Sequence, residues 1–159
     1  MNVLLVEDNP GDAFLIEEML DEMHDISIEL THVDTLKKAI SNLEKSVYDI
    51  VLLDLGLPDS EGLNALERVL ELNLDFPIVV ITGLNDIATG NKAVELGAQN
   101  YMVKGQFTGT SISQTIMYSI ERSKFLKKLK AKEAELTAKN KALEEVVASK
   151  NLLISIISH

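Results

Sequence analysis

The chain has 159 residues, which is enough for one compact domain and an appendage. Its apolar fraction is 46% and its aromatic fraction is only 4%, so the core must consist mainly of aliphatic side chains. The sequence has no cysteine, which excludes disulfides, thiolate metal sites and thiol nucleophiles.

The charge is unevenly distributed along the chain. Residues 1–120 carry 6 basic and 20 acidic residues, a net charge of -14, whereas residues 121–159 carry 9 and 5, a net charge of +4. An acidic globule repels nucleic-acid backbones and attracts cations, so we expect no direct binding to nucleic acid. The N-terminal segment MNVLLVEDNP resembles neither a signal peptide nor a membrane span, and a cytoplasmic location is expected.

Five short apolar runs recur over residues 1–120, and each is followed by a stretch with helical periodicity. The expected strands are Asn2–Val6, Ile28–Val33, Asp49–Leu53, Pro77–Ile81 and Asn100–Val103. Runs such as VLLV, IVLL and IVVI are apolar on both faces, as parallel strands covered by helices on both sides require. The pattern predicts an α/β fold with a five-stranded parallel, doubly wound sheet.

Chain breakers and apolar spacing indicate four helices between these strands. The first two are expected after Pro10-Gly11 and after Asp34-Thr35. The third is expected over about residues 60–72 and the fourth over about residues 86–96, where Gly97 supplies a stop.

From Ser111 onward the sequence has neither Gly nor Pro, which predicts one long helix. Apolar residues recur in it every seven positions. The d positions of these heptads are Leu129, Leu136 and Leu143, and the a positions are Leu126, Glu133, Asn140, Val147 and Ile154. An Asn at an a position favours parallel two-stranded pairing. We therefore expect a parallel homodimer through residues 121–159, and a single helix folded back on the globule is the alternative.

Reactive side chains follow the expected strands. In a parallel α/β sheet the functional loops lie beyond the carboxyl ends of the strands, and there the sequence places Glu7-Asp8, Asp54, Thr82 and Lys104. Converging carboxylates repel one another unless a divalent cation offsets them, and all-oxygen ligation suits Mg²⁺. A carboxylate in such a pocket can attack phosphorus while the metal and a lysine neutralise charge. Asp54 is placed for that role.

These residues lie in the segments LLVEDN, DIVLLDLGLPDSEG, VVITG and YMVKG, which closely resemble the receiver domain of two-component response regulators over residues 1–120. The resemblance implies a flavodoxin-like fold and a phosphorelay function in which Asp54 accepts a phosphoryl group from phosphohistidine of a partner protein. It also implies the metal ligands. Mg²⁺ would be bound directly by Asp8, by Asp54 and by the backbone carbonyl of Gly56, and through water by Glu7.

The same resemblance implies roles for the remaining residues. Thr82 would bond a phosphoryl oxygen, Lys104 would pair with the phosphate, and Tyr101 would be the switch aromatic whose rotamer follows Thr82. A receiver catalyses both its own phosphorylation and its own dephosphorylation. Because neither Gly56 nor Leu84 offers a side chain to hold an attacking water, a long-lived phosphoaspartate is expected.

A second resemblance concerns the end of the chain. The segment NLLISIISH resembles the approach to the phosphorylated histidine of histidine kinases, and the heptads with Glu121-Arg122 at their head resemble the helix that links a sensory domain to the kinase dimerisation helices. This implies that His159 is a phosphoacceptor in a longer parent protein and that residues 121–159 form a signalling helix.

The output of the receiver would then be a histidine kinase, although this chain lacks a Gly-rich nucleotide loop and a kinase catalytic domain. The alternatives are a dimerisation or scaffolding module with a receiver-like fold, and a receiver that controls another output enzyme.

Overall fold

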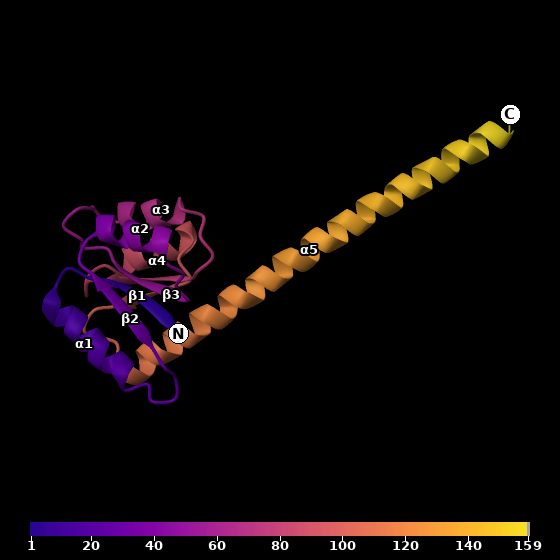
Figure 1. The fold of residues 1–159 in the computed structure, drawn as a ribbon. Helices are drawn as coiled ribbons and strands as arrows, with labels where there is room; N and C mark the ends of the chain where they lie inside the picture. The colour runs from indigo at the N-terminus through magenta and orange to yellow at the C-terminus, as the bar shows by residue number, and fades with distance from the viewer. Residues whose placement is uncertain (159) are drawn as a thin grey trace. The chain divides into compact units, whose positions relative to one another are not determined.

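The computed structural model describes residues 1–158 (Figure 1), so the phosphoacceptor role of His159 lies outside the described residues. Strands and helices alternate as expected. The elements are β1 (Asn2–Val6), α1 (Pro10–Asp21), β2 (Glu29–Val33), α2 (Leu36–Lys45), β3 (Ile50–Asp54), α3 (Asn64–Leu70), β4 (Ile78–Thr82), α4 (Ile87–Leu96), β5 (Asn100–Val103) and α5 (Gly109–Ser158). Met1–Ser123 form one compact unit, and the segment from Lys124 onward is a second.

The five strands form one parallel sheet with the order β2-β1-β3-β4-β5. The predicted doubly wound, flavodoxin-like fold is therefore confirmed, and the strand ends differ from the predicted ones by at most one residue. The chain winds outward in both directions from β1 and β3. The crevice beyond the carboxyl ends of these two strands is the topological switch point, where sheets of this kind bind ligands.

Helices cover both faces of the sheet. Successive strand residues point to opposite faces, so Leu4 and Val6 pack in a core with α2, α3 and α4, whereas Val3 and Leu5 pack in a second core with α1. The first turns of α5 complete this second core through the buried side chains of Ile112 and Ile116. Because both faces are covered, every residue of β3 and β4 is buried.

Two helices differ from their expected bounds. Helix α3 starts at Asn64 instead of residue 60, because Gly62 adopts a left-handed conformation with a φ of 53° that interrupts a helix. Helix α5 starts at Gly109, two residues earlier than expected. There the Thr108 N–H donates to Ser111 Oγ over 2.8 Å and the Ser111 N–H donates to Thr108 Oγ1 over 3.3 Å, so the two residues cap the helix reciprocally.

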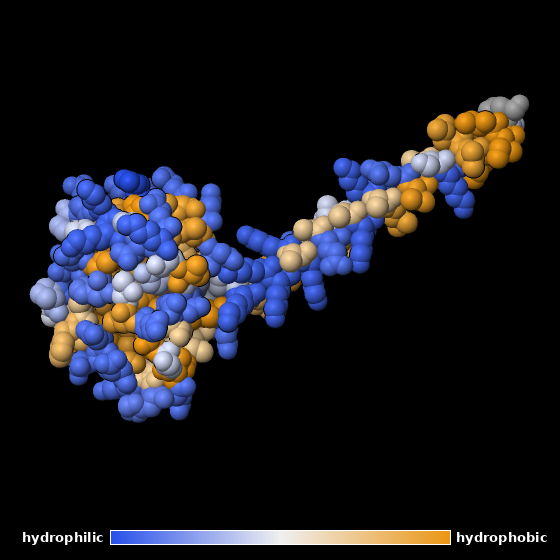
Figure 2. Space-filling view, in the orientation of Figure 1, coloured by the Kyte–Doolittle hydropathy of each residue, from blue (hydrophilic) through white to orange (hydrophobic). Residues whose placement is uncertain are grey.

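The second unit consists of the later part of α5. Its heptad positions are exposed in the single chain, and Leu143 for example exposes 62% of its surface. Figure 2 shows hydrophobic side chains gathering near the end of this helix, where the exposed residues are Leu152, Leu153, Ile154, Ile156 and Ile157. Within residues 1–158, no helix combines the length and the hydropathy needed to cross a bilayer.

Candidate functional site

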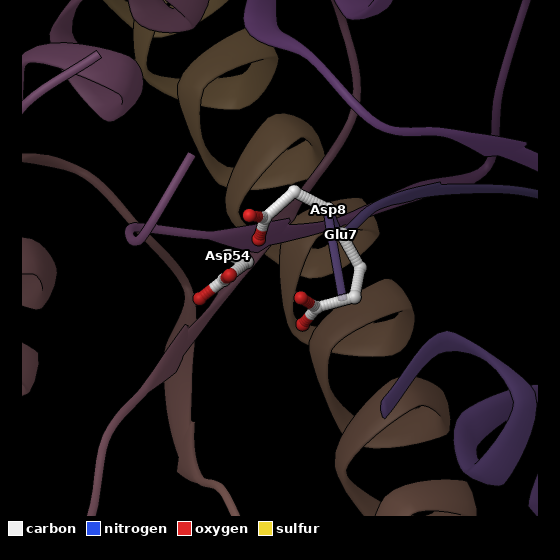
Figure 3. Close-up of side chains that lie close together, drawn as sticks. All are labelled: Glu7, Asp8 and Asp54. Carbon is white, nitrogen blue, oxygen red and sulfur yellow. The ribbon is translucent and has the colours of Figure 1, made fainter. Parts of the chain in front are cut away.

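Three carboxylates meet beyond the ends of β1 and β3. Val6 and Leu53 are partners in the sheet, so the residues that follow them, Glu7-Asp8 and Asp54, lie next to each other. Each of the three side chains offers an oxygen within 4.8 Å of the other two (Figure 3). Glu7 and Asp54 are buried and Asp8 is exposed, so solvent reaches the cluster at Asp8.

A single ammonium group lies against this cluster. Lys104 follows β5, and its Nζ is 2.8 Å from Glu7 Oε2, 3.0 Å from Asp12 Oδ2 and 3.1 Å from Asp54 Oδ2. Burial opposes the charge of Lys104, but its hydrogen bonds and proximity to these carboxylates raise its pKa above the ordinary value. Lys104 is therefore a permanent cation at this site.

Glu7 is the most deeply placed of the acids, with no exposed surface. Its Oε1 accepts a hydrogen bond of 3.0 Å from the Asn9 N–H, whereas the contact of Oε2 with Lys104 is an ion pair without hydrogen-bond geometry. Burial, together with the charge of Asp54, raises the pKa of Glu7 to about 7 against the opposing effects of Lys104 and the Asn9 amide. Glu7 Oε2 thus has no hydrogen-bond partner among the described residues.

The backbone of Glu7 is held by the neighbouring strand β2. The Glu7 N–H donates to the Val33 carbonyl over 3.0 Å, and His32 Nε2 lies 2.7 Å from the Glu7 carbonyl oxygen, to which it donates if it carries the proton. Both contacts come from the strand at the edge of the sheet. The last residues of β2 therefore fix the peptide that carries the buried acid.

A cavity of about 450 Å³ opens over the cluster. Its lining includes Asp8, Asp12, Asp54, Gly56, Thr82 and Lys104. The Thr82 hydroxyl donates to the Met102 carbonyl over a long 3.4 Å, so it is only weakly engaged. A Cβ on Gly56 would lie 3.4 Å from Asp54 Oδ2, so a glycine here keeps the approach to that carboxylate open.

The structure brings together the residues that the strand ends predict, because Glu7, Asp8, Asp54, Thr82 and Lys104 all lie at one edge of the sheet. Their separate roles stay predictions.

Tyr101 is placed differently. It is half-buried and does not line the cavity, and its ring packs on Gly90 of α4 so closely that a Cβ there would come within 2.7 Å of the ring carbon Cγ.

One member of the site, Asp12, is not predicted from the sequence. This residue lies in the first turn of α1, where the Asn9 side chain caps the helix by accepting from the Gly11 and Asp12 N–H groups. The signal was an acid in the first turn of a helix that begins at the functional edge of the sheet. Its side chain reaches Lys104, which is 92 positions away in the sequence.

Comparison with known proteins agrees with this geometry. The family model of the response regulator receiver domain matches residues 3–116. The transcriptional regulatory protein BasR of Escherichia coli K12 is 31% identical over 104 residues, which cover 65% of this chain and 46% of BasR. The response regulator ArlR of Staphylococcus saprophyticus is 37% identical over 103 residues, which cover 64% of this chain and 44% of ArlR. The chain therefore matches less than half the length of these relatives.

Solved structures share the fold. The receiver domain of the Francisella response regulator 1452 superposes with a TM-score of 0.67 at 20% identity, covering 77% of this chain and 98% of that one. The receiver domain of NtrX from Brucella abortus has a TM-score of 0.67 at 24% identity, covering 75% and 98%. With the family model matching most of residues 1–123, the chain belongs to the response regulator receiver domain family of two-component systems.

Proposed function

We propose that Asp54 accepts a phosphoryl group from phosphohistidine of a donor protein in a Mg²⁺-dependent reaction, and that this modification regulates a dimeric output through the helix of residues 121–159. One observation carries the proposal. The buried Asp54 carboxylate lines a cavity, where it lies beside the carboxylates of Glu7 and Asp8 and 3.1 Å from the ammonium of Lys104.

The residues present fit a divalent cation. The buried Glu7 carboxylate, which pairs with Lys104, lies within 4.8 Å of two further carboxylates, and an all-oxygen donor set of this kind suits Mg²⁺. Asp8, Asp54 and the Gly56 carbonyl would hold the ion directly, and Glu7 would hold it through water. When bound, Mg²⁺ neutralises charge on the oxygens of the phosphoryl group.

The chemistry follows from the groups around Asp54. One carboxylate oxygen of Asp54 forms an O–P bond while the N–P bond of the donor phosphohistidine breaks, and the leaving imidazole nitrogen keeps the electron pair. Lys104 would pair with the transferred phosphoryl oxygens, because its charge is permanent and within reach of Asp54. Thr82 would bond another phosphoryl oxygen, since its present bond to Met102 is weak, and Tyr101 would follow the movement of Thr82.

The test of the phosphoacceptor is direct. The protein is mixed with Mg²⁺ and a small phosphodonor such as acetyl phosphate, and its intact mass is measured. We expect one phosphoryl adduct, which Asp54→Asn or removal of Mg²⁺ with a chelator abolishes. Asp21→Asn, an exposed acid at the last residue of α1, is the matched control and should keep the adduct. An unmodified wild-type protein would favour the scaffolding alternative.

The same adduct tests the predicted lifetime. Gly56 lines the cavity, and the exposed Leu84 lies two residues after Thr82. Neither has a side chain that could orient an attacking water. We expect the phosphoaspartate to persist for minutes or longer after the donor is removed, and decay within seconds would contradict this proposal.

The proposed output is a dimer formed in parallel through residues 121–159, with a histidine kinase as the regulated enzyme. Exposed apolar residues at the a and d positions support the dimer, because a single solvated helix gains nothing from such a stripe. The kinase output predicts that the parent protein continues after Ser158-His159 with an acidic residue and a Leu-Arg-Thr-Pro segment. A different continuation would favour another output enzyme.

A further inference from the structure

Lys104 has three carboxylate partners among the described residues, and they are not equivalent. Glu7 and Asp54 belong to the acidic cluster in which oxygens of all three members lie within 4.8 Å of one another. Asp12 is not a member of that cluster, yet its Oδ2 accepts a hydrogen bond of 3.0 Å from Lys104. We propose that Asp12 is a positioning residue that keeps Lys104 beside Asp54 when a divalent cation occupies the acidic cluster.

The reason is the competition between two cations for the same oxygens. A divalent ion in the cluster would withdraw Glu7 and Asp54 from Lys104 and would also repel its ammonium group. Lysine has a flexible four-carbon stem and a strongly hydrated head, so without another partner Lys104 would turn toward solvent. Asp12 supplies that partner, because it bonds to Lys104 and is not a member of the acidic cluster.

Asp12 is well suited to hold a side chain in place. It lies in the first turn of α1, which the Asn9 side chain caps and which buried Ala13 and Ile16 attach to the sheet. Asp12 is half-buried and lines the cavity. A rigid element thus presents the Asp12 carboxylate to Lys104.

This inference rests on the proposed function. Two roles of Asp12, addition of negative charge alone and positioning of Lys104, predict different results when Asp12 is removed. If Asp12 only added negative charge, its removal would weaken cation binding but would ease the approach of an anionic phosphodonor. If Asp12 positions Lys104, its removal weakens cation binding only while Lys104 is present, because an ion that takes Glu7 and Asp54 then leaves the ammonium without a carboxylate partner. Its removal also slows phosphorylation, because Lys104 is no longer held near the transferring group.

The cation arm of the test is a double-mutant cycle with Mn²⁺ as the probe, and binding is measured by electron paramagnetic resonance of the free ion. We expect Asp12→Asn to weaken Mn²⁺ binding about fivefold, the scale of one partly exposed charged hydrogen bond. In a Lys104→Gln background most of this loss should disappear. An equal loss in both backgrounds would show that Asp12 does not act through Lys104, and the inference would be wrong.

The second arm measures the rate of phosphorylation by acetyl phosphate at saturating Mg²⁺. Asp12→Asn should slow the reaction about fivefold, again on the scale of one charged hydrogen bond, and an unchanged or faster rate would overturn the inference. Glu18→Gln removes an exposed acid from the same helix and should leave both measurements unchanged. Far-ultraviolet circular dichroism verifies that each variant is folded. A wild-type protein that neither binds Mn²⁺ nor becomes phosphorylated refutes the proposed function, whereas a functional wild-type protein without coupling refutes only the role of Asp12.

Discussion

The two units of the chain differ in how far their charged and apolar side chains are buried. In residues 1–123 the side chain of Lys104 is only 25% exposed and its ammonium meets three carboxylates, and the central strands β3 and β4 are buried on both faces. In the later part of α5, the ion pair of Lys139 and Glu135 spans 2.9 Å between side chains that are 70% and 63% exposed. A pair of that kind contributes little stability. The first unit buries its apolar side chains within one chain, whereas the second leaves an apolar stripe exposed, which supports the proposed pairing with another helix.

The largest expected effect is loss of the proposed dimer through a substitution in the second unit alone. Leu136→Lys places a charge at a central d position, and we expect a dimer to become a monomer, measured by sedimentation velocity. Ala138→Lys, two residues further on at an outward f position, should remain dimeric. Phosphorylation of Asp54 should be unchanged in both variants, since the site lies in residues 1–123. If Leu136→Lys stays dimeric, the proposed interface is wrong and the dimer forms through another surface.

The next effect concerns the buried acid of the first unit and depends on pH. The pKa of Glu7 rises from its ordinary 4.5 to about 7 in the folded protein, chiefly because of burial and with a contribution from Asp54. As the pH rises, the unfolded chain therefore loses this proton at a lower pH than the folded protein does. The free energy of unfolding of the metal-free protein should fall between pH 4.5 and about 7 and then level off.

The affinity for Mg²⁺ should change in the opposite direction. Binding requires the ionised carboxylate, so the affinity should rise about tenfold per pH unit below pH 7 and then become constant. Calorimetric titration across this range measures it. In Glu7→Gln both pH dependences should disappear, and a wild-type affinity that is flat between pH 5 and 7 would contradict the assignment.

A smaller effect tests how tightly the first unit is packed. Gly90→Ala would drive a methyl group into the ring of Tyr101, and overpacking of this kind costs about 1–3 kcal/mol, partly offset by the better helix propensity of alanine. Urea unfolding measures the change. In a Tyr101→Ala background the same substitution should be neutral or stabilising. Gly83→Ala is the matched control, since a Cβ there meets no atom within 4 Å.

The smallest effect concerns the contact between the loop after β3 and the start of α2. Asp59, in the loop after β3, accepts hydrogen bonds of 2.9 Å and 3.0 Å from the Leu36 and Lys37 N–H groups at the start of α2. Slight burial opposes the charge of Asp59, but these amides lower its pKa below 3.8, so its contribution to stability is lost as the pH falls through that lowered value. Asp59→Ala should cost about 1 kcal/mol in urea unfolding, and Asp59→Asn, which keeps one acceptor oxygen, about half as much.

Much of the fold and the centre of the site could be predicted from the sequence. Apolar runs such as IVVI identify buried parallel strands, and the carboxyl ends of such strands meet at one edge of the sheet. This rule alone placed Asp54, Thr82 and Lys104 together, as the structure confirms. The strand order was not available from the pattern, because apolar runs identify the strands but not which strands are neighbours.

The residues that could not be predicted act between elements. Asp12 reaches Lys104 only because α1 crosses the sheet with its first turn over the cavity, and no local spacing encodes that direction. The packing of Tyr101 on Gly90 likewise depends on how α4 lies against β5. The predicted start of α3 was wrong, because the sequence does not distinguish a left-handed Gly62 from a glycine that a helix tolerates.

The contacts of the Glu7 backbone with β2 affect the local stability of the site. An edge strand is bonded on one side only, so its terminal hydrogen bonds open more readily than those of β1 or β3. When the end of β2 frays, the Glu7 carbonyl loses His32 and the Glu7 amide loses Val33 together. The preorganisation of the deepest acid thus depends on an edge strand of the sheet, and amide hydrogen exchange at Glu7 reports how often the pocket loosens.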